Sequence, residues 1–371
     1  MPTQRPTPPE EFAYQAQPVA TIVDIARVCQ VSSASVSRVL TGLPGVKAMK
    51  REEILKAAEA LGYRPNRAAR RLVTQKSHLL GFIASDLRNA AYLEYFHTLE
   101  RAVRADGYEF LIADSERSAD RERANIERML DNRVDGLMVL PVSDWIGPGN
   151  IKHLERLQMS RLPSVLFGHL EGAQFDSVSS DEFHAARLLI EHLHHLGHQK
   201  FGFIELADAM NRPQNERLQG VLNAMHSLNL PSSCLRVMDA NTPHWTEDII
   251  DALNSKSAPT ALICVNDLLA LSLLRPFQKA GISVPEAVSI VAFGKTMLTD
   301  TALTDLVSPS LTLAEFDNQA VAKNGAAMLL ERLANPSLPY RTVRIPASFV
   351  IRESTTLPQQ RSVSSLKRFS N

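Results

Sequence analysis

The sequence predicts a small all-α head near the amino terminus, followed by a larger α/β body with parallel sheets. Three observations carry this prediction. Residues 21–42 contain two short amphipathic helical patterns separated by a tight turn. From Leu79 onward, short apolar runs alternate with helical patterns, as in parallel sheets with crossover helices. The charge is also divided: residues 1–76 hold 12 Lys and Arg against 6 Asp and Glu, whereas the rest holds 28 against 34.

Two capping signals define the first helices. Thr21 and Asp24 form a T-x-x-D start, and Ser32 offers a second cap, so we predict helices over 22–28 and 33–40. The second helix has a polar face without acidic side chains. That face suits a helix lying in the DNA major groove, although an ordinary helical hairpin with a solvated face would show the same pattern.

A third helix is predicted from Lys47 to Leu61, ending at Gly62 as a left-handed cap. The segment after it is rich in arginine. Between Asp24 and Leu72 the chain carries D-I-A-x-x-x-x-V-S-x-x-S-V-S-R-V-L and then G-Y-x-P-N-x-A-A-x-x-L. In these motifs it resembles the LacI (lactose-repressor) family of transcription regulators.

The resemblance implies an organisation for the whole chain, with a helix-turn-helix head and a two-lobed body like that of periplasmic sugar-binding proteins. In such a protein the hinge folds on operator DNA and inserts a leucine into the minor groove. The expected parts are a disordered tail (1–18), the helix-turn-helix DNA-binding domain (19–65), a hinge helix (66–77), the two-lobed effector-binding and dimerisation domain (78–355) and a flexible tail (356–371).

The resemblance also implies which residues contact double-stranded operator DNA. Arginines neutralise phosphates, and an apolar wedge at a base step kinks the duplex. Carried over by position, the DNA-binding residues are Thr21, Ser33, Ala34, Ser35, Ser37, Arg38, Thr41, Tyr63, Asn66, Arg67, Ala69 and Leu72.

The head departs from the family pattern at two positions. Gln30 stands where the family usually has glycine, which costs about 1 kcal/mol if this residue must be left-handed. Lys47 stands where a serine cap usually begins the third helix. In addition, Ser33 and Ala34 are short, so sequence readout is expected to depend on Arg38, the hinge and DNA deformability.

The pattern of the body predicts about two parallel sheets. A ligand would then bind outside the carboxyl ends of the strands, where two halves face each other. The predicted strands cover 79–84, 109–113, 136–140, 164–167, 201–205, 261–265 and 288–293, and the predicted helices include 93–105, 121–131, 182–196, 216–227 and 268–279.

Five residues are candidates for the effector site. Arg217 matches the arginine that family members direct into the cleft, and Asn266 and Asp267 directly follow a predicted strand. Asn89 and Tyr92 lie in the first loop, where the tyrosine could stack on a ring. For each of these residues a structural role such as helix capping is the alternative.

The expected effector is a small molecule of the sugar or sugar-derived class. Gly168 and Gly294 stand where relatives often carry an aspartate that holds sugar hydroxyls, while Arg217 is retained and His169 and Lys295 lie adjacent. A cleft with less negative charge would favour an anionic effector, such as a sugar acid or phosphate.

The remaining features favour a regulator without a cofactor or metal. The three cysteines have no disulfide or zinc spacing, and the HLHHLGH segment (192–198) is interpreted as a helix end rather than a metal site. There is no G-x-S-x-G, H-E-x-x-H or G-x-G-x-x-G motif, so we do not expect an enzyme.

We therefore predict a homodimeric, cytoplasmic transcription regulator that acts as a repressor. Two other classes of protein are alternatives. A solute-binding protein would need an export signal, whereas the first twenty residues are proline-rich and lack an apolar core. A sugar- or nucleotide-dependent enzyme would need a catalytic constellation, and the sequence shows none.

Overall fold

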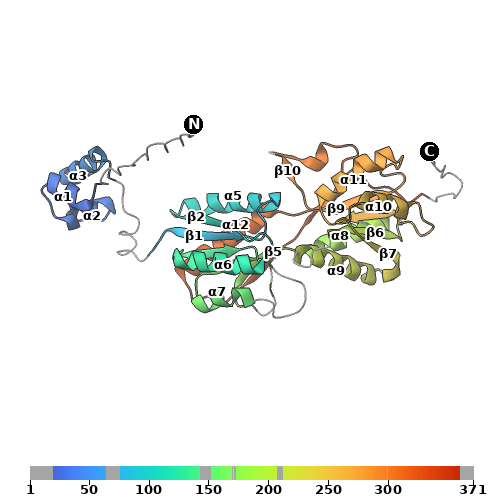
Figure 1. Ribbon diagram of the computed structural model, residues 1–371, viewed down its shortest axis with the longest axis horizontal. Coiled ribbons are helices and arrows are strands. Elements are labelled where there is room, and N and C mark those ends of the chain that lie inside the picture. Colours follow the sequence, from blue (N-terminus) through green and yellow to red (C-terminus); the bar gives the residue numbers. More distant parts are fainter. Residues whose placement is uncertain are drawn as a thin grey trace, which may run out of the picture. The chain divides into compact units, whose positions relative to one another are not determined.

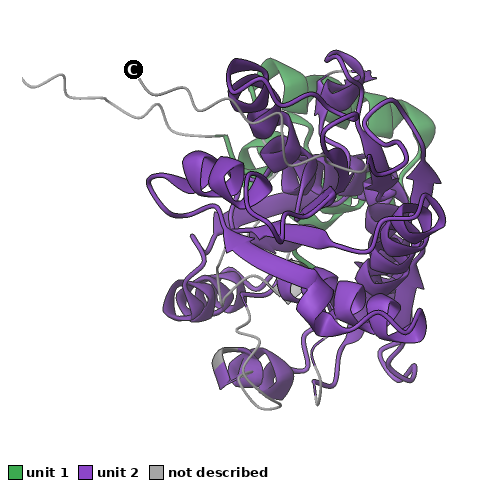
Figure 2. Ribbon diagram, turned by 90° about the vertical axis from the view of Figure 1, so that its right-hand side faces the viewer, with its two compact units in different colours: residues 1–77 green, residues 78–371 purple. Residues whose placement is uncertain are grey.

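The computed structural model has its helices and strands in the order labelled in Figure 1 and divides into two compact units, residues 1–77 and residues 78–371 (Figure 2). No helix in the described part of the chain is long and apolar enough to cross a bilayer. The predicted tail over 1–18 and most of the predicted hinge helix lie outside the described residues. The structure describes residues 20–63, 76–142, 152–168, 170, 173–206, 212–298 and 300–359.

The first unit contains three helices, α1 (Ile22–Val28), α2 (Ser33–Leu40) and α3 (Ala48–Ala60). Both predicted caps are confirmed. Thr21 and Asp24 form a reciprocal capping box, and the Ser32 hydroxyl accepts a hydrogen bond from the Ser35 amide at 3.1 Å. The three helices close on a core centred on side chains with no exposed surface, Ile25, Val36 and Ile54.

The turn between α1 and α2 places a non-glycine residue in the left-handed region. Gln30 has φ of 50°, as anticipated for the position where relatives have glycine. At the end of α3, Gly62 has φ of 60°, which confirms the predicted left-handed cap. Lys47, at the start of α3, makes no side-chain capping bond, so this helix begins without the cap that a serine would provide.

The substitution Gln30→Gly should stabilise the head. An L-residue in the left-handed region costs about 1–2 kcal/mol, which exceeds the roughly 0.5–1 kcal/mol of extra chain entropy that glycine loses on folding. Amide hydrogen exchange of the α1 and α2 core residues in the full-length protein measures the change. We expect slower exchange in the variant, and faster exchange would show that Gln30 makes a stabilising contact.

The second unit has two lobes, each built on a six-stranded sheet. The first sheet has the order β13-β5-β4-β3-β1-β2, and all of its strand pairs are parallel. One face is covered by α5 (Ala90–Arg104) and α12 (Asn318–Ala334), and the other by α6 (Ala119–Asp131) and α7 (Glu155–Ser160) (Figure 1). Its strands are β1 (Leu79–Ala84), β2 (Glu109–Asp114), β3 (Gly136–Val139), β4 (Ser164–Phe167), β5 (Asp176–Ser180) and β13 (Thr342–Ile345).

The second sheet has the order β14-β12-β9-β8-β6-β7, and only β14 runs antiparallel to its neighbour. Helices α8 (Glu182–His195) and α9 (Arg212–Ser227) lie on one side, and α10 (Trp245–Leu253) and α11 (Asp267–Lys279) on the other (Figure 1). The strands are β6 (Phe201–Glu205), β7 (Leu235–Asp239), β8 (Ala261–Cys264), β9 (Ser289–Phe293), β12 (Thr312–Glu315) and β14 (Ser348–Val350), with a hairpin of β10 (Met297–Leu298) and β11 (Thr301–Ala302) beside them.

The chain passes between the two sheets at three described places: after β5, after β12 and after β13. The first passage is short, because β5 ends at Ser180 and α8 begins at Glu182. Beyond β14 the chain is still tied to the second lobe. The Thr356 amide donates to Ser289 Oγ at 3.0 Å, and its carbonyl oxygen lies 2.9 Å from His198 Nε2.

The predicted fold class, a helix-turn-helix head with a two-lobed body of parallel sheets, is confirmed. All seven predicted strands are present, as β1 to β4, β6, β8 and β9, and the five predicted helices are α5, α6, α8, α9 and α11. The prediction did not include several other elements. These are strands β5, β7 and β10 to β14 and helices α7, α10 and α12.

Candidate functional site

The exposed face of α2 is the candidate DNA-binding surface. Ser33, Ala34 and Arg38 are exposed, and Ser35 and Ser37 are half-buried. The helix contains no acidic residue, and its only charged side chain is Arg38. An exposed helix start that carries serine hydroxyls next to a guanidinium suits the phosphates and base edges of duplex DNA.

Some predicted contact residues also hold the head together. The Thr21 side chain caps α1, Ser35 Oγ lies 2.9 Å from Ser32 Oγ, and Thr41 Oγ1 donates to the Ser37 carbonyl oxygen at 2.7 Å. These bonds fix the orientation of the hydroxyls before any ligand is bound. A substitution at Thr21 or Thr41 would therefore change the helix ends as well as any DNA contact.

Arg38 is less constrained. Its Nη1 donates a long hydrogen bond, 3.4 Å, to the Pro44 carbonyl oxygen. Tyr63 is half-buried and packs against the core of the head. The other predicted hinge contacts lie outside the described residues; they are Asn66, Arg67, Ala69 and Leu72.

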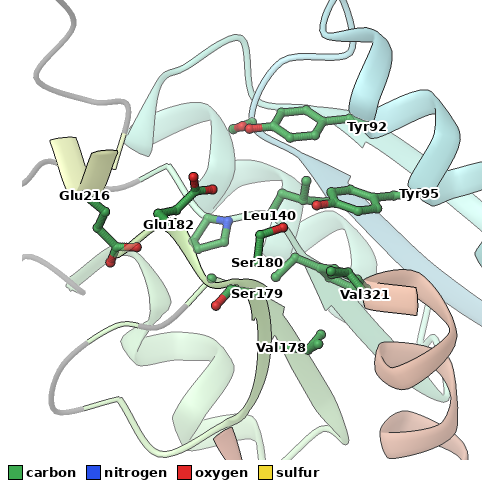
Figure 3. A pocket seen from close by; sticks show the side chains of 13 residues that line it. Tyr92, Tyr95, Leu140, Val178, Ser179, Ser180, Glu182, Glu216 and Val321 are labelled. Carbon is green, nitrogen blue, oxygen red and sulfur yellow. The ribbon is translucent and has the colours of Figure 1, made fainter. Parts of the chain in front are cut away.

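A pocket lies at the carboxyl ends of the strands of the first lobe (Figure 3). It encloses about 600 Å³, part of which is open to solvent. Most of its lining comes from the ends of β1, β3, β4 and β5 and from α5 and α12. The second lobe contributes Glu182 at the start of α8 and Glu216 on α9, so the pocket is formed between the lobes.

The first lobe gives the pocket an aromatic wall. The rings of Tyr92 and Tyr95 stack with centroids 6.1 Å apart, and the ring of Tyr95 is tilted against Phe167 at 5.6 Å. Burial raises the pKa of both tyrosines, which also hydrogen-bond to Ser85 and Ser180. The wall therefore offers ring faces for stacking and neutral hydroxyls for hydrogen bonds.

The second lobe places a buried ion pair at the same pocket. Arg217 Nε donates to Glu182 Oε2 at 2.7 Å, Nη2 donates to Oε1 at 3.3 Å, and Nη1 donates to the Val265 carbonyl oxygen at 2.6 Å. The rings of Phe293 and Phe316 lie 5.4 and 5.0 Å from the guanidinium carbon. Burial raises the pKa of Glu182, and the adjacent guanidinium opposes this shift.

Two of the five predicted effector residues have the alternative role, helix capping. The Asn89 side chain accepts a hydrogen bond from the Ala91 amide at the start of α5, at 3.1 Å. The Asn266 side chain accepts one from the Leu269 amide at the start of α11, at 2.7 Å. Neither residue lines the pocket.

Asp267 is buried and also lies outside the lining. Its carboxylate accepts hydrogen bonds from the amide and hydroxyl of Thr296, at 2.5 and 3.0 Å. Tyr92, in contrast, lines the pocket directly. Arg217 reaches it through Glu182, so the structure brings Tyr92 and Arg217 together and leaves the other three predicted residues apart.

The two cations on which the expected anionic effector depends are both paired with glutamates. Arg217 is paired with Glu182, and Lys295 is paired with Glu315 at 2.8 Å. Arg352 also donates to Glu315, at 2.7 Å, and these two cations lower the pKa of that carboxyl. Both cations that favoured an anionic effector are therefore already neutralised by glutamates that the sequence pattern did not connect to them.

The two glycines that replace aspartates have a conformational role. Gly168 has φ of 135° and Gly294 has φ of 86°, where an L-residue would be strained. His169 lies outside the described residues. The loss of the two carboxylates therefore comes with a backbone conformation that favours glycine.

The pocket residues that sequence reasoning missed lie at or just after the end of a strand, or in the first two turns of a helix. Two of these residues, Ser179 and Ser180, lie on strand β5, which was not predicted. The full set of missed residues is Ser85, Tyr95, Phe167, Ser179, Ser180, Glu182 and Glu216.

The close packing of α8 against α9 holds Glu182 and Arg217 in register. A Cβ on Gly220 would lie 2.7 Å from the Ala186 Cβ and 3.1 Å from the Phe183 Cα. These atoms cannot move without moving α8. Glycine in α9 is therefore required by the approach of the two helices.

The substitution Gly220→Ala should destabilise the body by about 1–3 kcal/mol, because the added methyl group overpacks the helix contact. In an uncrowded helix the same change would stabilise by up to about 1 kcal/mol. The sign of the change in free energy of unfolding, measured by urea denaturation, distinguishes the two cases. A stabilised variant would show that α8 and α9 are not in close contact.

No group of three or more potential metal ligands occurs among the residues that the structure describes. Within the histidine-rich segment, His192 Nε2 lies 3.0 Å from the Thr355 hydroxyl, and its ring packs edge-on against Phe349 with centroids 5.0 Å apart. His198 lies between Thr260 and the carbonyl oxygen of residue 356. Both rings have structural partners that hold the end of the chain on the second lobe.

A helix-turn-helix head with an acid-free second helix, joined in one chain to a two-lobed body with an interlobe pocket, defines a DNA-binding transcription regulator with a ligand-binding domain. The family model for bacterial regulatory proteins of the lacI family matches residues 21–66, and that for a periplasmic binding protein-like domain matches residues 190–355. Together with the relatives below, these two matches indicate a LacI family regulator.

Three known proteins are similar along most of their length. Catabolite control protein A of Priestia megaterium is 29% identical over 342 residues, which cover 90% of this chain and 99% of the relative. A crystal structure of the lac repressor dimer bound to operator and the anti-inducer ONPF has a TM-score of 0.79 at 23% identity, covering 91% of this chain and 99% of the other. A LacI family regulator from Enterococcus faecium with bound ribose has a TM-score of 0.63 at 22% identity, covering 76% and 100%.

Proposed function

We propose that the protein is a repressor that acts in the cytoplasm, binds a near-palindromic operator as a homodimer, and changes its DNA occupancy when a small molecule binds between the lobes. The observation that carries this proposal is the match of residues 21–66 to the lacI family model, at the place where α2 presents an exposed face without acids. Two identical heads related by a twofold axis suit two half-sites.

The proposed DNA contacts fall into two sets. The α2 set would lie in or beside the major groove, and the hinge set would contact the minor groove, with Leu72 as the wedge. The α2 set consists of Thr21, Ser33, Ala34, Ser35, Ser37, Arg38 and Thr41. The hinge set consists of Tyr63, Asn66, Arg67, Ala69 and Leu72.

The proposed effector site is the pocket between the lobes, with Tyr92 and the Glu182–Arg217 pair at its wall. A ligand that touches both lobes has more contacts in a closed body than in an open one, so it shifts the equilibrium between two states of the regulator. The relative with bound ribose supports a carbohydrate or a derivative as the effector class. Asn89, Asn266 and Asp267 would act by positioning the loops around this pocket.

The proposed homodimer can use an apolar surface on the second lobe. Thr296 links the two segments that carry this surface, the start of α11 and the segment around Leu303. The Thr296 amide donates to Asp267 at the start of α11, and the Thr296 carbonyl oxygen accepts from the Leu303 amide. The four apolar side chains on these segments are between 37% and 59% exposed. Single exposed apolar residues are common on protein surfaces, but several on connected segments are typical of an interaction site. They are Leu268, Met297, Leu298 and Leu306. The structure described as a lac repressor dimer supports a second copy as the partner.

Selection of duplexes from a random pool by the purified full-length protein tests the proposal. We expect enrichment of one sequence with approximate twofold symmetry, and a change in its retention when a metabolite panel contains the effector. In the variant Tyr95→Ala, which loses part of the aromatic wall, the change should disappear while selection of the duplex persists. A pool that shows no enrichment would contradict the proposed function.

A further inference from the structure

We propose that Glu182 sets the charge selectivity of the interlobe pocket by occupying Arg217, so that the pocket takes a ring-bearing ligand that donates hydrogen bonds and carries no carboxylate or phosphate. This inference rests on the proposed function of the pocket as an effector site. It assigns the ligand class to one side chain of this chain.

The first step is that Arg217 is not available to an anion. Its Nε and Nη2 edge, the edge that matches a carboxylate or phosphate, is occupied by the two oxygens of Glu182 at 2.7 and 3.3 Å. Its Nη1 is held by the Val265 carbonyl oxygen at 2.6 Å. The side chain is only 13% exposed, and the rings of Phe293 and Phe316 lie within 5.4 Å of its guanidinium carbon, so it has little room to turn toward another partner.

The backbone of Glu182 is held in place by the start of α8 and by its packing against α9. It is the first residue of α8, directly after β5 and the Asp181 cap, where the chain passes from the first lobe to the second. Its side chain is 7% exposed, and α9 packs so closely on α8 that Gly220 lies against residues 182, 183 and 186. The backbone that carries Glu182 is therefore fixed, and an anionic ligand would have to displace a buried carboxylate from its two-point contact with Arg217.

With Arg217 occupied, the pocket presents carboxylate and hydroxyl oxygens to a ligand. Glu182 and Glu216 both line it, and each raises the cost of bringing another negative charge close. Figure 3 shows Glu182 and the Ser180 hydroxyl on the side of the pocket that faces Tyr92 and Tyr95. A ring between these walls would stack on the tyrosines and donate hydroxyl or amine hydrogens to carboxylate and serine oxygens.

The experiment uses inorganic phosphate as the probe and the full-length protein in wild-type form and with Glu182→Ala, Glu182→Gln and Glu182→Ala/Arg217→Met. Binding is measured by isothermal titration calorimetry at constant ionic strength. We expect phosphate to bind Glu182→Ala about tenfold or more tightly than wild type, the factor that one charge-assisted hydrogen bond supplies. Glu182→Gln, which retains the shape of the side chain, should show a smaller gain, and the double variant should show none.

Equal phosphate affinity in the wild-type protein and in both single variants would overturn the inference, as would a gain that persists without Arg217. Tighter binding of a sugar phosphate or uronic acid to wild type than of the matching neutral sugar would overturn it as well. Duplex binding by the wild-type protein is measured in parallel. Its absence would count against the proposed function alone, because the phosphate titration does not depend on DNA.

Discussion

The substitution Asp176→Ala should lower the free energy of unfolding of the body by about 3–5 kcal/mol, the cost of leaving one partner of a buried ion pair unpaired. Asp176 has no exposed surface, and its Oδ2 accepts a hydrogen bond from Arg332 Nε at 2.8 Å. Arg332 is 5% exposed, and its guanidinium donates further hydrogen bonds to the carbonyl oxygens of residues 336, 338 and 339. Without the carboxylate, Arg332 remains as a buried charge with neutral acceptors only.

The Asp176–Arg332 pair joins several elements of the first lobe, so its loss should destabilise the whole lobe. Asp176 begins β5, Arg332 is near the end of α12, and the Arg341 amide at the entry to β13 donates to Asp176 Oδ1 at 3.0 Å. One carboxylate thus joins two neighbouring strands and the helix that covers them. Urea unfolding of the full-length protein, followed by circular dichroism, measures the loss.

Two further variants control this prediction. The double variant Asp176→Ala/Arg332→Met removes both charges and should recover much of the loss, because no buried charge remains. Arg187→Ala breaks an exposed pair with Glu191 at 3.2 Å and should cost no more than about 0.5 kcal/mol. If Asp176→Ala is no more costly than Arg187→Ala, the buried pair does not have the structural role assigned to it.

The second large effect is expected on DNA binding. The substitution Arg38→Ala should weaken operator binding by about 1–3 kcal/mol, which is roughly 5- to 150-fold, because the neighbouring polar residues of α2 are serines, which carry no charge and cannot make a bidentate contact. If Arg38 contacts a phosphate, the slope of the logarithm of the binding constant against that of salt concentration should fall in magnitude by about 1. Fluorescence anisotropy with a selected duplex gives both quantities.

Arg27→Ala is the matched control for Arg38→Ala. Arg27 is also an exposed arginine of the head, with a side chain 76% exposed, but it lies on α1 and pairs with Asp24 at 3.3 Å. Its removal should change operator affinity much less than the removal of Arg38. Equal losses in the two variants would mean that the head binds through diffuse positive charge rather than through the face of α2.

Much of the fold could be predicted because the elements that form it have strong local signals. The two head helices were bounded correctly from the Thr21 and Ser32 caps, and strand β1 from a run of apolar residues. Strand β5 has the sequence DSVSS and was missed, because it contains no apolar run; in the sheet it lies between β4 and β13, and β13 is more than 160 residues away in the sequence. Its polar side chains are buried by long-range contacts that no local pattern records.

The effector site was harder to predict for the same reason. Tyr92 could be identified from its place after the first strand, and Arg217 from its motif. That Arg217 is bound by Glu182, 35 positions earlier, depends on the packing of α8 against α9. The neutralisation of Arg217 was therefore not predicted, because the sequence shows which charges exist but not which of them neutralise each other.

The central claim is that the amino-terminal helices bind duplex DNA and that this chain is a DNA-binding regulator. Binding of the full-length protein to a labelled, selected duplex, measured over a range of salt concentrations, tests it most directly. The claim predicts a logarithm of the binding constant that falls linearly with the logarithm of salt concentration, by about 0.9 for each phosphate neutralised. Failure to bind any double-stranded oligonucleotide at low ionic strength, with or without candidate effectors, would contradict it.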